Sequence, residues 1–271
     1  MKIGRIDGRI PFISGGSGER CAVVFFGANA LFQPLDRGAP AQYARLVSRL
    51  LPFDYRYLIL GYDPDPPPHY GFPQIVDDFA AILRAQAAPA DVIGVSFGGF
   101  VAQRLGADHP ALLRRLVLLV SAHRFSPAGL ARMKQQEALM RAGDLQGFVR
   151  DMALLFRRPW YNFGARLALA MSGAAIADRL NDRDTMLALY ERLFTGFDST
   201  PWTQRIRTPT LVLGATRDQF FDVAAYRETA ALIPGARLHL VKDETHFVPL
   251  ERPQLVQRVI REFLASVTRE P

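Results

Sequence analysis

The stretch that most constrains the fold is DVIGVSFGG at residues 91–99, an apolar run that stops at a serine between glycines. We interpret it as a strand, a sharp turn and a helix that runs to about residue 108. The pattern Gly94-x-Ser96-x-Gly98 is typical of a nucleophile elbow, where the serine backbone is strained and small neighbours let strand and helix approach closely. Such a turn would present the Ser96 hydroxyl at the edge of a sheet. It would also place the Phe97 N–H at the start of the helix, where free amides and the helix dipole favour an oxyanion.

Strand and helix patterns alternate on both sides of this stretch, which predicts a doubly wound, mostly parallel sheet with helices on both faces. The expected strands are residues 2–6, 9–13, 21–26, 55–60, 91–95, 116–120, 210–213 and 237–241. The expected helices are residues 43–51, 72–88, 97–108, 223–232 and 253–267.

A second pattern interrupts the alternation, because helical stretches follow one another between residues 122 and 207 with no strand among them. The candidates are residues 130–142, 145–156, 164–176 and 184–194. We therefore expect an α/β core domain of residues 1–121 and 208–271 and an all-helical cap of residues 122–207. The 271 residues, 49% of them hydrophobic, suffice for one large domain with such an insertion.

A serine hydroxyl is a weak nucleophile until a base removes its proton, and a third group must hold that base. Asp218 follows the strand expected at residues 210–213, and His246 follows the last strand. Both loops lie at the carboxyl ends of strands, toward which the elbow points. The order Ser96, Asp218, His246 suits this architecture. Asp222 is the other candidate acid, and Asp218 is preferred because it lies nearer the strand end.

The loop after residues 21–26 is expected to face the same crevice, so we assign the second oxyanion N–H to Ala28, with Asn29 close by. The residues expected to contact the substrate are Phe26, His123, Trp160 and Phe247. The proline-rich segment 61–70 is expected to form a rigid wall of that crevice.

The chain resembles the α/β-hydrolase fold superfamily, in particular its cofactor-free, serine esterase-like branch with a helical cap. The resemblance covers nearly the whole chain and rests on GVSFGG at residues 94–99, GATRD at 214–218 and THFVPLERP at 245–253. Two positions depart from it. Phe26-Gly27 stands where the family commonly has His-Gly, and the usual proline after the acid is missing near Asp222.

A serine at the elbow, in place of a carboxylate, indicates an acyl-enzyme and thus acyl transfer. The leading hypothesis is a serine hydrolase that cleaves a carboxylic ester of a small to medium apolar acyl substrate. A second is a thioesterase or acyltransferase whose partner is an acyl carrier protein docked by cap arginines. A third is a hydrolase-fold binding protein with little turnover. Cleavage of a carbon–carbon bond is a minor alternative.

The charge of +7 and the pI near 9.9 do not predict nucleic-acid binding, because the arginines are scattered among acids. No apolar run is long enough to span a bilayer, and the first residues lack the apolar core of a signal peptide, so we expect a cytoplasmic protein. The single cysteine, Cys21, is expected to be a buried thiol. No cofactor or metal site is expected, and the oligomeric state is left open.

Overall fold

An eight-stranded sheet forms the centre of the protein, and the computed structural model describes residues 1–37, 39–52 and 54–266. The strands lie in the order β1-β2-β4-β3-β5-β6-β7-β8. β2 is antiparallel to both β1 and β4, and all other neighbouring pairs are parallel. The α/β class with a mostly parallel sheet is thereby confirmed. The strands are β1 (Lys2–Ile6), β2 (Ile10–Gly15), β3 (Arg20–Phe25), β4 (Tyr55–Leu60), β5 (Ala90–Val95), β6 (Leu113–Leu119), β7 (Thr210–Ala215) and β8 (Arg237–Val241).

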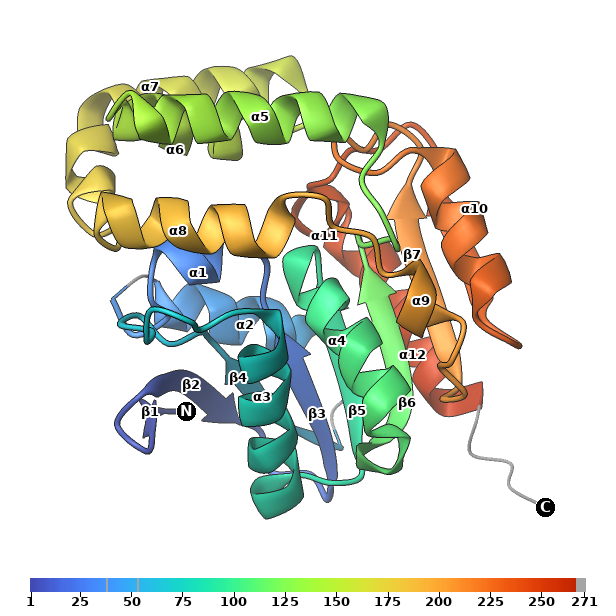
Figure 1. The fold of residues 1–271 in the computed structure, drawn as a ribbon. Helices are drawn as coiled ribbons and strands as arrows, with labels where there is room; N and C mark the ends of the chain where they lie inside the picture. Colours follow the sequence, from blue (N-terminus) through green and yellow to red (C-terminus); the bar gives the residue numbers. More distant parts are fainter. Residues whose placement is uncertain (38, 53, 267–271) are drawn as a thin grey trace.

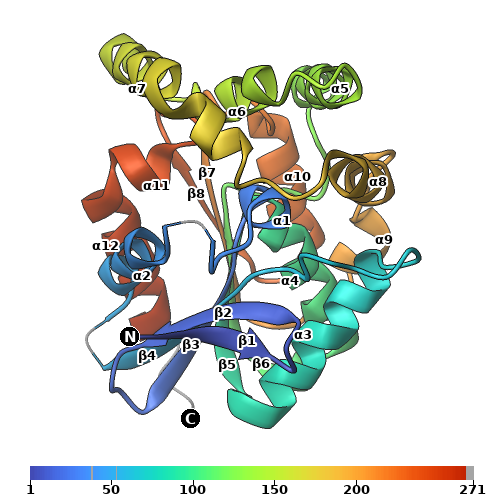
Figure 2. The same ribbon diagram turned by 90° about the vertical axis from the view of Figure 1, so that its left-hand side faces the viewer.

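Helices cover both faces of this sheet, as Figure 2 shows along its edge. One face carries α2 and α12, which contact each other, and the other carries α3, α4 and α10. The strands β3, β5 and β6 between these layers are almost wholly buried, which explains their continuous apolar sequences. The helices are α2 (Pro40–Leu50), α3 (Phe72–Gln86), α4 (Phe97–Asp108), α10 (Val223–Leu232) and α12 (Pro253–Ser266). Val267, the expected last residue of the final helix, lies outside the described residues.

Four helices follow one another between β6 and β7 and lie across the carboxyl ends of the strands (Figure 1). They are α5 (Pro127–Arg141), α6 (Leu145–Ala153), α7 (Pro159–Ala177) and α8 (Arg183–Phe194). α9 (Thr200–Thr203), which follows them, packs instead against α4 and α10. The exact borders of a cap domain at residues 122 and 207 stay a prediction.

Three short helices, a 3₁₀ turn and the early start of α7 were not predicted from the sequence. α1 (Asn29–Phe32), α9 and α11 (Val248–Glu251) have four residues each, too few for a helical period to show. A 3₁₀ turn, Pro110–Leu112, precedes β6. α7 begins at Pro159, five residues before the expected start, because proline is well suited to the first turn of a helix.

A buried ion pair links β5 to β6. Asp91 lies 3.3 Å from Arg115, and both side chains are almost fully buried. The hydroxyl of Tyr55 donates to Asp91 at 2.6 Å. Burial and this bond raise the pKa of Tyr55 to about 12, so the phenol stays protonated and keeps donating. The partially exposed Arg114 is a more distant third partner, 3.7 Å from Asp91.

Replacing Arg115 with methionine is expected to lower the free energy of unfolding by about 3–5 kcal/mol, because it leaves the Asp91 carboxylate buried without its nearest cation. Urea denaturation at neutral pH measures the loss. The control is Arg114→Met, which removes the more exposed partner and should cost less than about 1 kcal/mol. Equal losses in the two variants would contradict this assignment.

Candidate active site

The turn between β5 and α4 has the geometry that the sequence pattern predicts. Ser96 has φ 53° and ψ −120°, a left-handed conformation that non-glycine residues rarely adopt. The glycines on either side permit this turn: a Cβ on Gly94 would lie 2.5 Å from Gly99 Cα, and one on Gly98 would lie 2.1 Å from the Phe25 carbonyl oxygen. The elbow is thus built on close contact between backbones.

Gly98→Ala is expected to destabilise the protein by about 3 kcal/mol, because the new methyl group meets the rigid backbone of β3. Gly164→Ala in α7 is the matched control, since nothing lies within 4 Å of a Cβ there. At that position alanine should be neutral or stabilise by up to about 1 kcal/mol. Thermal and urea unfolding compare the two variants, and similar stabilities would argue against a packed elbow.

Ser96, His246 and Asp218 come together above the carboxyl ends of β5, β7 and β8. His246 Nε2 lies 3.0 Å from Ser96 Oγ, and His246 Nδ1 lies 2.8 Å from Asp218 Oδ2. The imidazole is almost buried and the Asp218 side chain is fully so. With Nδ1 carrying the proton, Nε2 is free to accept the hydroxyl proton of Ser96.

Four donors hold the carboxylate of Asp218. Its Oδ1 accepts the N–H groups of Phe220 and Phe221 at 2.8 and 3.2 Å, and its Oδ2 accepts the hydroxyl of Tyr226 at 2.7 Å in addition to the His246 contact. Burial, reinforced by the adjacent carboxylate, raises the pKa of Tyr226 well above its ordinary value, so the phenol remains a donor.

Asp222, the alternative acid, lies at the start of α10. Its Oδ1 accepts the N–H of Ala225 at 2.7 Å and caps the helix. The structure therefore places Asp218, and not Asp222, against the imidazole.

Phe97 and Ala28, whose N–H groups are predicted to form the oxyanion hole, line the same cavity as Ser96. Phe97 is the first residue of α4, and Ala28 precedes α1. A Cβ on Gly27 would lie 3.3 Å from the Ser96 Cβ, which brings the loop after β3 next to the serine. Asn29 donates from its side chain to the Tyr43 hydroxyl at 3.1 Å, so it braces this loop against α2.

A cavity of about 590 Å³ lies over Ser96, between the sheet and helices α5 to α8. Its wall is mostly aromatic and aliphatic and includes the predicted contacts Phe26 and Phe247. Helices of the insertion contribute Met133, Phe148, Met152, Leu169 and Phe194.

Two of the expected substrate contacts do not line this cavity. His123 is buried elsewhere: its backbone N–H and its ring both contact Thr229 Oγ1, at 2.9 and 3.0 Å. Burial lowers the pKa of this imidazole, which suits a neutral structural residue. Trp160 lies on the outer surface of α7, because the helix begins before it and turns its ring toward solvent. The proline-rich segment 61–70 is also absent from the cavity wall, so that expectation was wrong.

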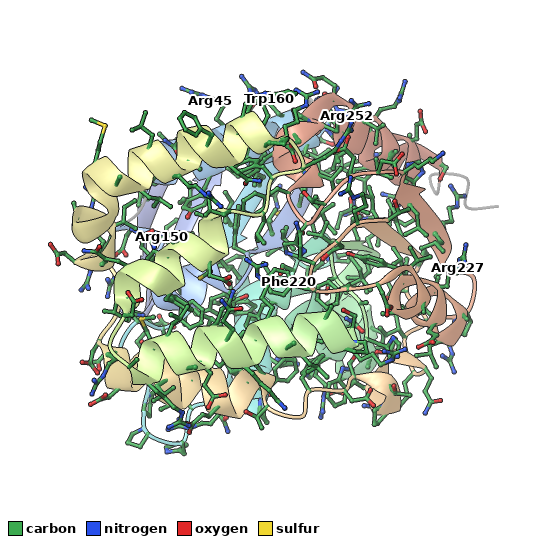
Figure 3. All side chains as sticks on the ribbon, turned by 90° about the horizontal axis from the view of Figure 1, so that it is seen from above. Arg45, Arg150, Trp160, Phe220, Arg227 and Arg252 are labelled. Carbon is green, nitrogen blue, oxygen red and sulfur yellow. The ribbon has the colours of Figure 1, made fainter. Side chains whose placement is uncertain are left out.

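Two aromatic residues beside the imidazole, Phe220 and Phe221, line the cavity but were not predicted from the sequence. The Phe220 ring lies 4.8 Å from the His246 ring, and it appears near the centre of the view from above in Figure 3. Their position two and three residues after Asp218 was the signal in the sequence.

The insertion is joined to the core close to His246. Arg157 donates to the buried Glu244, two residues before the imidazole, at 2.8 Å. The backbone N–H of Arg157 donates to Glu251 at 2.7 Å. These contacts couple the start of α7 to the loop that positions His246.

Within the part of the chain that the structure describes, no group of three His, Cys, Asp or Glu side chains is arranged to hold a metal ion. None of its helices has the length and apolar content needed to cross a membrane.

The fold, the elbow and the cluster of Ser96, His246 and Asp218 are those of an α/β hydrolase. Comparison with known families agrees: the chain belongs to the alpha/beta hydrolase family, whose model matches residues 12–259. The superfamily resemblance of the sequence is thereby confirmed, and the family makes this protein a hydrolase.

Among individual proteins, the chain is 30% identical over 200 residues to the poly(3-hydroxyalkanoate) depolymerase of Ectopseudomonas oleovorans, covering 72% of this chain and 68% of that one. It is 29% identical over 206 residues to the putative non-heme bromoperoxidase BpoC of Mycobacterium tuberculosis, and the match covers 71% of this chain and 74% of that one. The crystal structure of BpoC superposes with a TM-score of 0.76 at 23% identity, over 99% of this chain and 97% of that one. A hydrolase from a Medee basin deep-sea metagenome superposes with a TM-score of 0.80 at 15% identity, over 100% and 99%.

Proposed function

We propose that this protein is a serine hydrolase that cleaves carboxylic esters of small to medium apolar acyl groups through an acyl-enzyme. The observation that carries the proposal is the contact series from Ser96 Oγ through His246 to the buried Asp218, beneath an apolar cavity. A serine held at 3.0 Å from an oriented imidazole is the arrangement required to activate a hydroxyl.

In the proposed reaction His246 Nε2 takes the proton of Ser96 while Oγ attacks the ester carbonyl. The N–H groups of Phe97 and Ala28 stabilise the negative charge on the carbonyl oxygen. His246 then gives its proton to the leaving alcohol. Water, deprotonated by the same imidazole, attacks the acyl-enzyme, and the imidazolium returns the proton to Ser96 Oγ as the acid is released. Asp218 keeps the Nδ1 proton in place and stabilises the imidazolium.

The cavity supports an apolar acyl group, because its aromatic and methionine side chains offer few partners to a polar chain. Its volume of about 590 Å³ is ample for a small to medium acyl chain. The name of the poly(3-hydroxyalkanoate) depolymerase supports an ester as the cleaved bond.

Docking of an acyl carrier protein on cap arginines receives less support. Arg132 is paired with Asp151 at 2.8 Å, and Arg141 is paired with Glu137 at 2.9 Å. Arg183 likewise lies 2.9 Å from Asp184. Because their charges are neutralised, these three arginines would attract an acidic carrier protein weakly, and we rank a free ester above a carrier-bound acyl chain.

Labelling with a fluorophosphonate tests the proposal, followed by hydrolysis of p-nitrophenyl acetate, butyrate, octanoate and palmitate. We expect one adduct on Ser96 and the highest kcat/KM for butyrate or octanoate. Octanoyl esters and thioesters of matched leaving groups separate the esterase from the thioesterase. A labelled protein that turns over none of them is a binding protein, and an unlabelled folded protein would refute an activated serine.

A further inference from the structure

Helix α7 is apolar on two opposite faces. Leu169 and Ile176 on its inner face line the cavity. The outer face carries four large apolar side chains at intervals of three, four and four residues, which at 3.6 residues per turn form one stripe. Their exposed fractions are 62% for Trp160, 71% for Phe163, 57% for Leu167 and 83% for Met171. We call these four residues the α7 stripe.

A stripe of this kind is uncommon on a water-exposed surface. Single exposed apolar residues are ordinary, but several large ones along one helix face mark a site of association. A helix that is apolar all round normally has both faces covered. The exposures show that nothing in the described part of the chain covers the α7 stripe.

The charged side chains of the segment that carries the stripe are all basic, although Arg157 is paired with Glu244 of the core. Residues 157–177 contain no aspartate or glutamate and three arginines, Arg157, Arg158 and Arg166. Arg166 is exposed. The Arg158 guanidinium lies over the rings of Trp160 and Tyr161, 5.7 and 5.5 Å from their centroids. An exposed apolar stripe with arginines close by can enter the boundary between the headgroups and acyl chains of an anionic membrane.

The stripe begins close to one side of the cavity. The rings of Phe156 and Phe247 are 4.8 Å apart, which joins the start of α7 to the segment just before α11. From there a shallow groove runs between α11 and α2, and it shares four lining residues with the cavity. Two arginines of α2, Arg45 and Arg49, line this groove. Figure 3 shows Arg45, Trp160 and Arg252 along the same edge of the molecule.

We propose that the α7 stripe and its flanking arginines bind the surface of an anionic phospholipid bilayer. Trp160, Phe163, Leu167 and Met171 would enter the boundary between headgroups and acyl chains, and Arg158 and Arg166 would contact lipid phosphates. The groove would then face the lipid, so that an apolar acyl substrate can pass into the cavity without crossing water. This binding goes beyond the proposed chemistry and does not require Ser96.

Co-sedimentation with vesicles tests the proposal. Wild type is expected to bind phosphatidylcholine vesicles that contain phosphatidylglycerol about 10-fold more tightly than vesicles of phosphatidylcholine alone, since each basic residue near the surface adds attraction. The double variant Phe163→Ser, Met171→Ser should lose about 10-fold or more in binding to both. The control is Leu238→Ser, an exposed apolar residue on β8, which should bind like wild type.

A second pair of variants isolates the charge. Arg166→Gln is expected to weaken binding to the phosphatidylglycerol vesicles about 3- to 5-fold. Arg227→Gln, an exposed arginine that Figure 3 shows on a different side of the molecule, should leave binding unchanged. If both substitutions weakened vesicle binding equally, the attraction would come from the net charge of the protein and not from the α7 stripe, and the proposal would be overturned.

Fluorescence reports on the stripe itself. The protein has two tryptophans, and Trp202 is packed against Phe72 and Phe197. In the variant Trp202→Phe the remaining emission comes from Trp160, and it should move to shorter wavelength when phosphatidylglycerol vesicles are added.

Three outcomes would overturn the proposal: no binding to either vesicle, equal binding to both, or self-association that the double variant abolishes, which would make a second copy the partner. Ser96→Ala should bind vesicles like wild type, and the double variant should hydrolyse a soluble ester at the wild-type rate. Failure of the proposed chemistry is therefore seen separately, in the soluble-ester assay of the wild type.

Discussion

Ser96→Ala is expected to lower kcat for a soluble p-nitrophenyl ester by about 10⁴-fold or more, because no other group lies in the position of Oγ. His246→Ala should cost about as much, and the double variant little more than either, since the two residues act as one unit. Initial rates under saturating ester, with active-site titration of the wild type, measure these losses.

Alanine at position 96 keeps the left-handed backbone strain and removes only one oxygen. The thermal midpoint should therefore stay close to that of wild type, which separates loss of chemistry from loss of fold. A Ser96→Ala protein that retains more than about one-hundredth of the wild-type rate would place the chemistry elsewhere.

Asp218→Asn and Asp222→Asn form a matched pair with a large expected difference. The first is expected to lower kcat about 10⁴-fold, because an amide at position 218 cannot fix the proton on Nδ1 of His246 or stabilise the imidazolium. The second should leave kcat within about 3-fold of wild type, since Asp222 caps α10 and asparagine is also a good cap.

Both variants are measured for kcat and for thermal stability. Asp222→Ala extends the comparison, because removing the cap altogether should cost about 1 kcal/mol of stability with little effect on rate. If Asp222→Asn were the inactive member of the pair, the acid of the proposed mechanism would have to be reassigned.

The elbow could be predicted because its causes are local. The apolar run, Ser96 and the glycines at 94, 98 and 99 lie within nine residues, and the steric demand for small neighbours is visible in the sequence. The structure shows the same steric demand, because a Cβ on Gly98 or Gly94 would lie only 2.1 or 2.5 Å from a neighbouring backbone atom.

The two predicted substrate contacts that proved wrong, His123 and Trp160, were wrong because their side chains point away from the cavity. His123 follows β6 closely, which suggested a place in the crevice. A turn with φ 46° at Val120 lies between them, and His123 contacts Thr229 instead. Trp160 was assigned to the cavity because it is aromatic and lies in the insertion, but the early start of α7 sets it on the outer face.

Other features had no local signal. Asp91 was taken as part of an apolar strand, and its partners Arg115 and Tyr55 lie 24 and 36 residues away. Four-residue helices such as α1 and α11 are too short to show a period, yet both position residues of the cavity wall.

By itself the sequence determined the class of fold, the strained turn at Ser96 and the order of serine, aspartate and histidine, because strand and helix periods and tight-turn sterics act over a few residues. Tertiary structure decided that Asp218 faces His246 while Asp222 caps a helix, and which side chains of α7 face the cavity or the solvent. These outcomes depend on rotations of whole helices and on contacts between segments more than 100 residues apart, such as Ser96 and His246, which a local pattern does not contain.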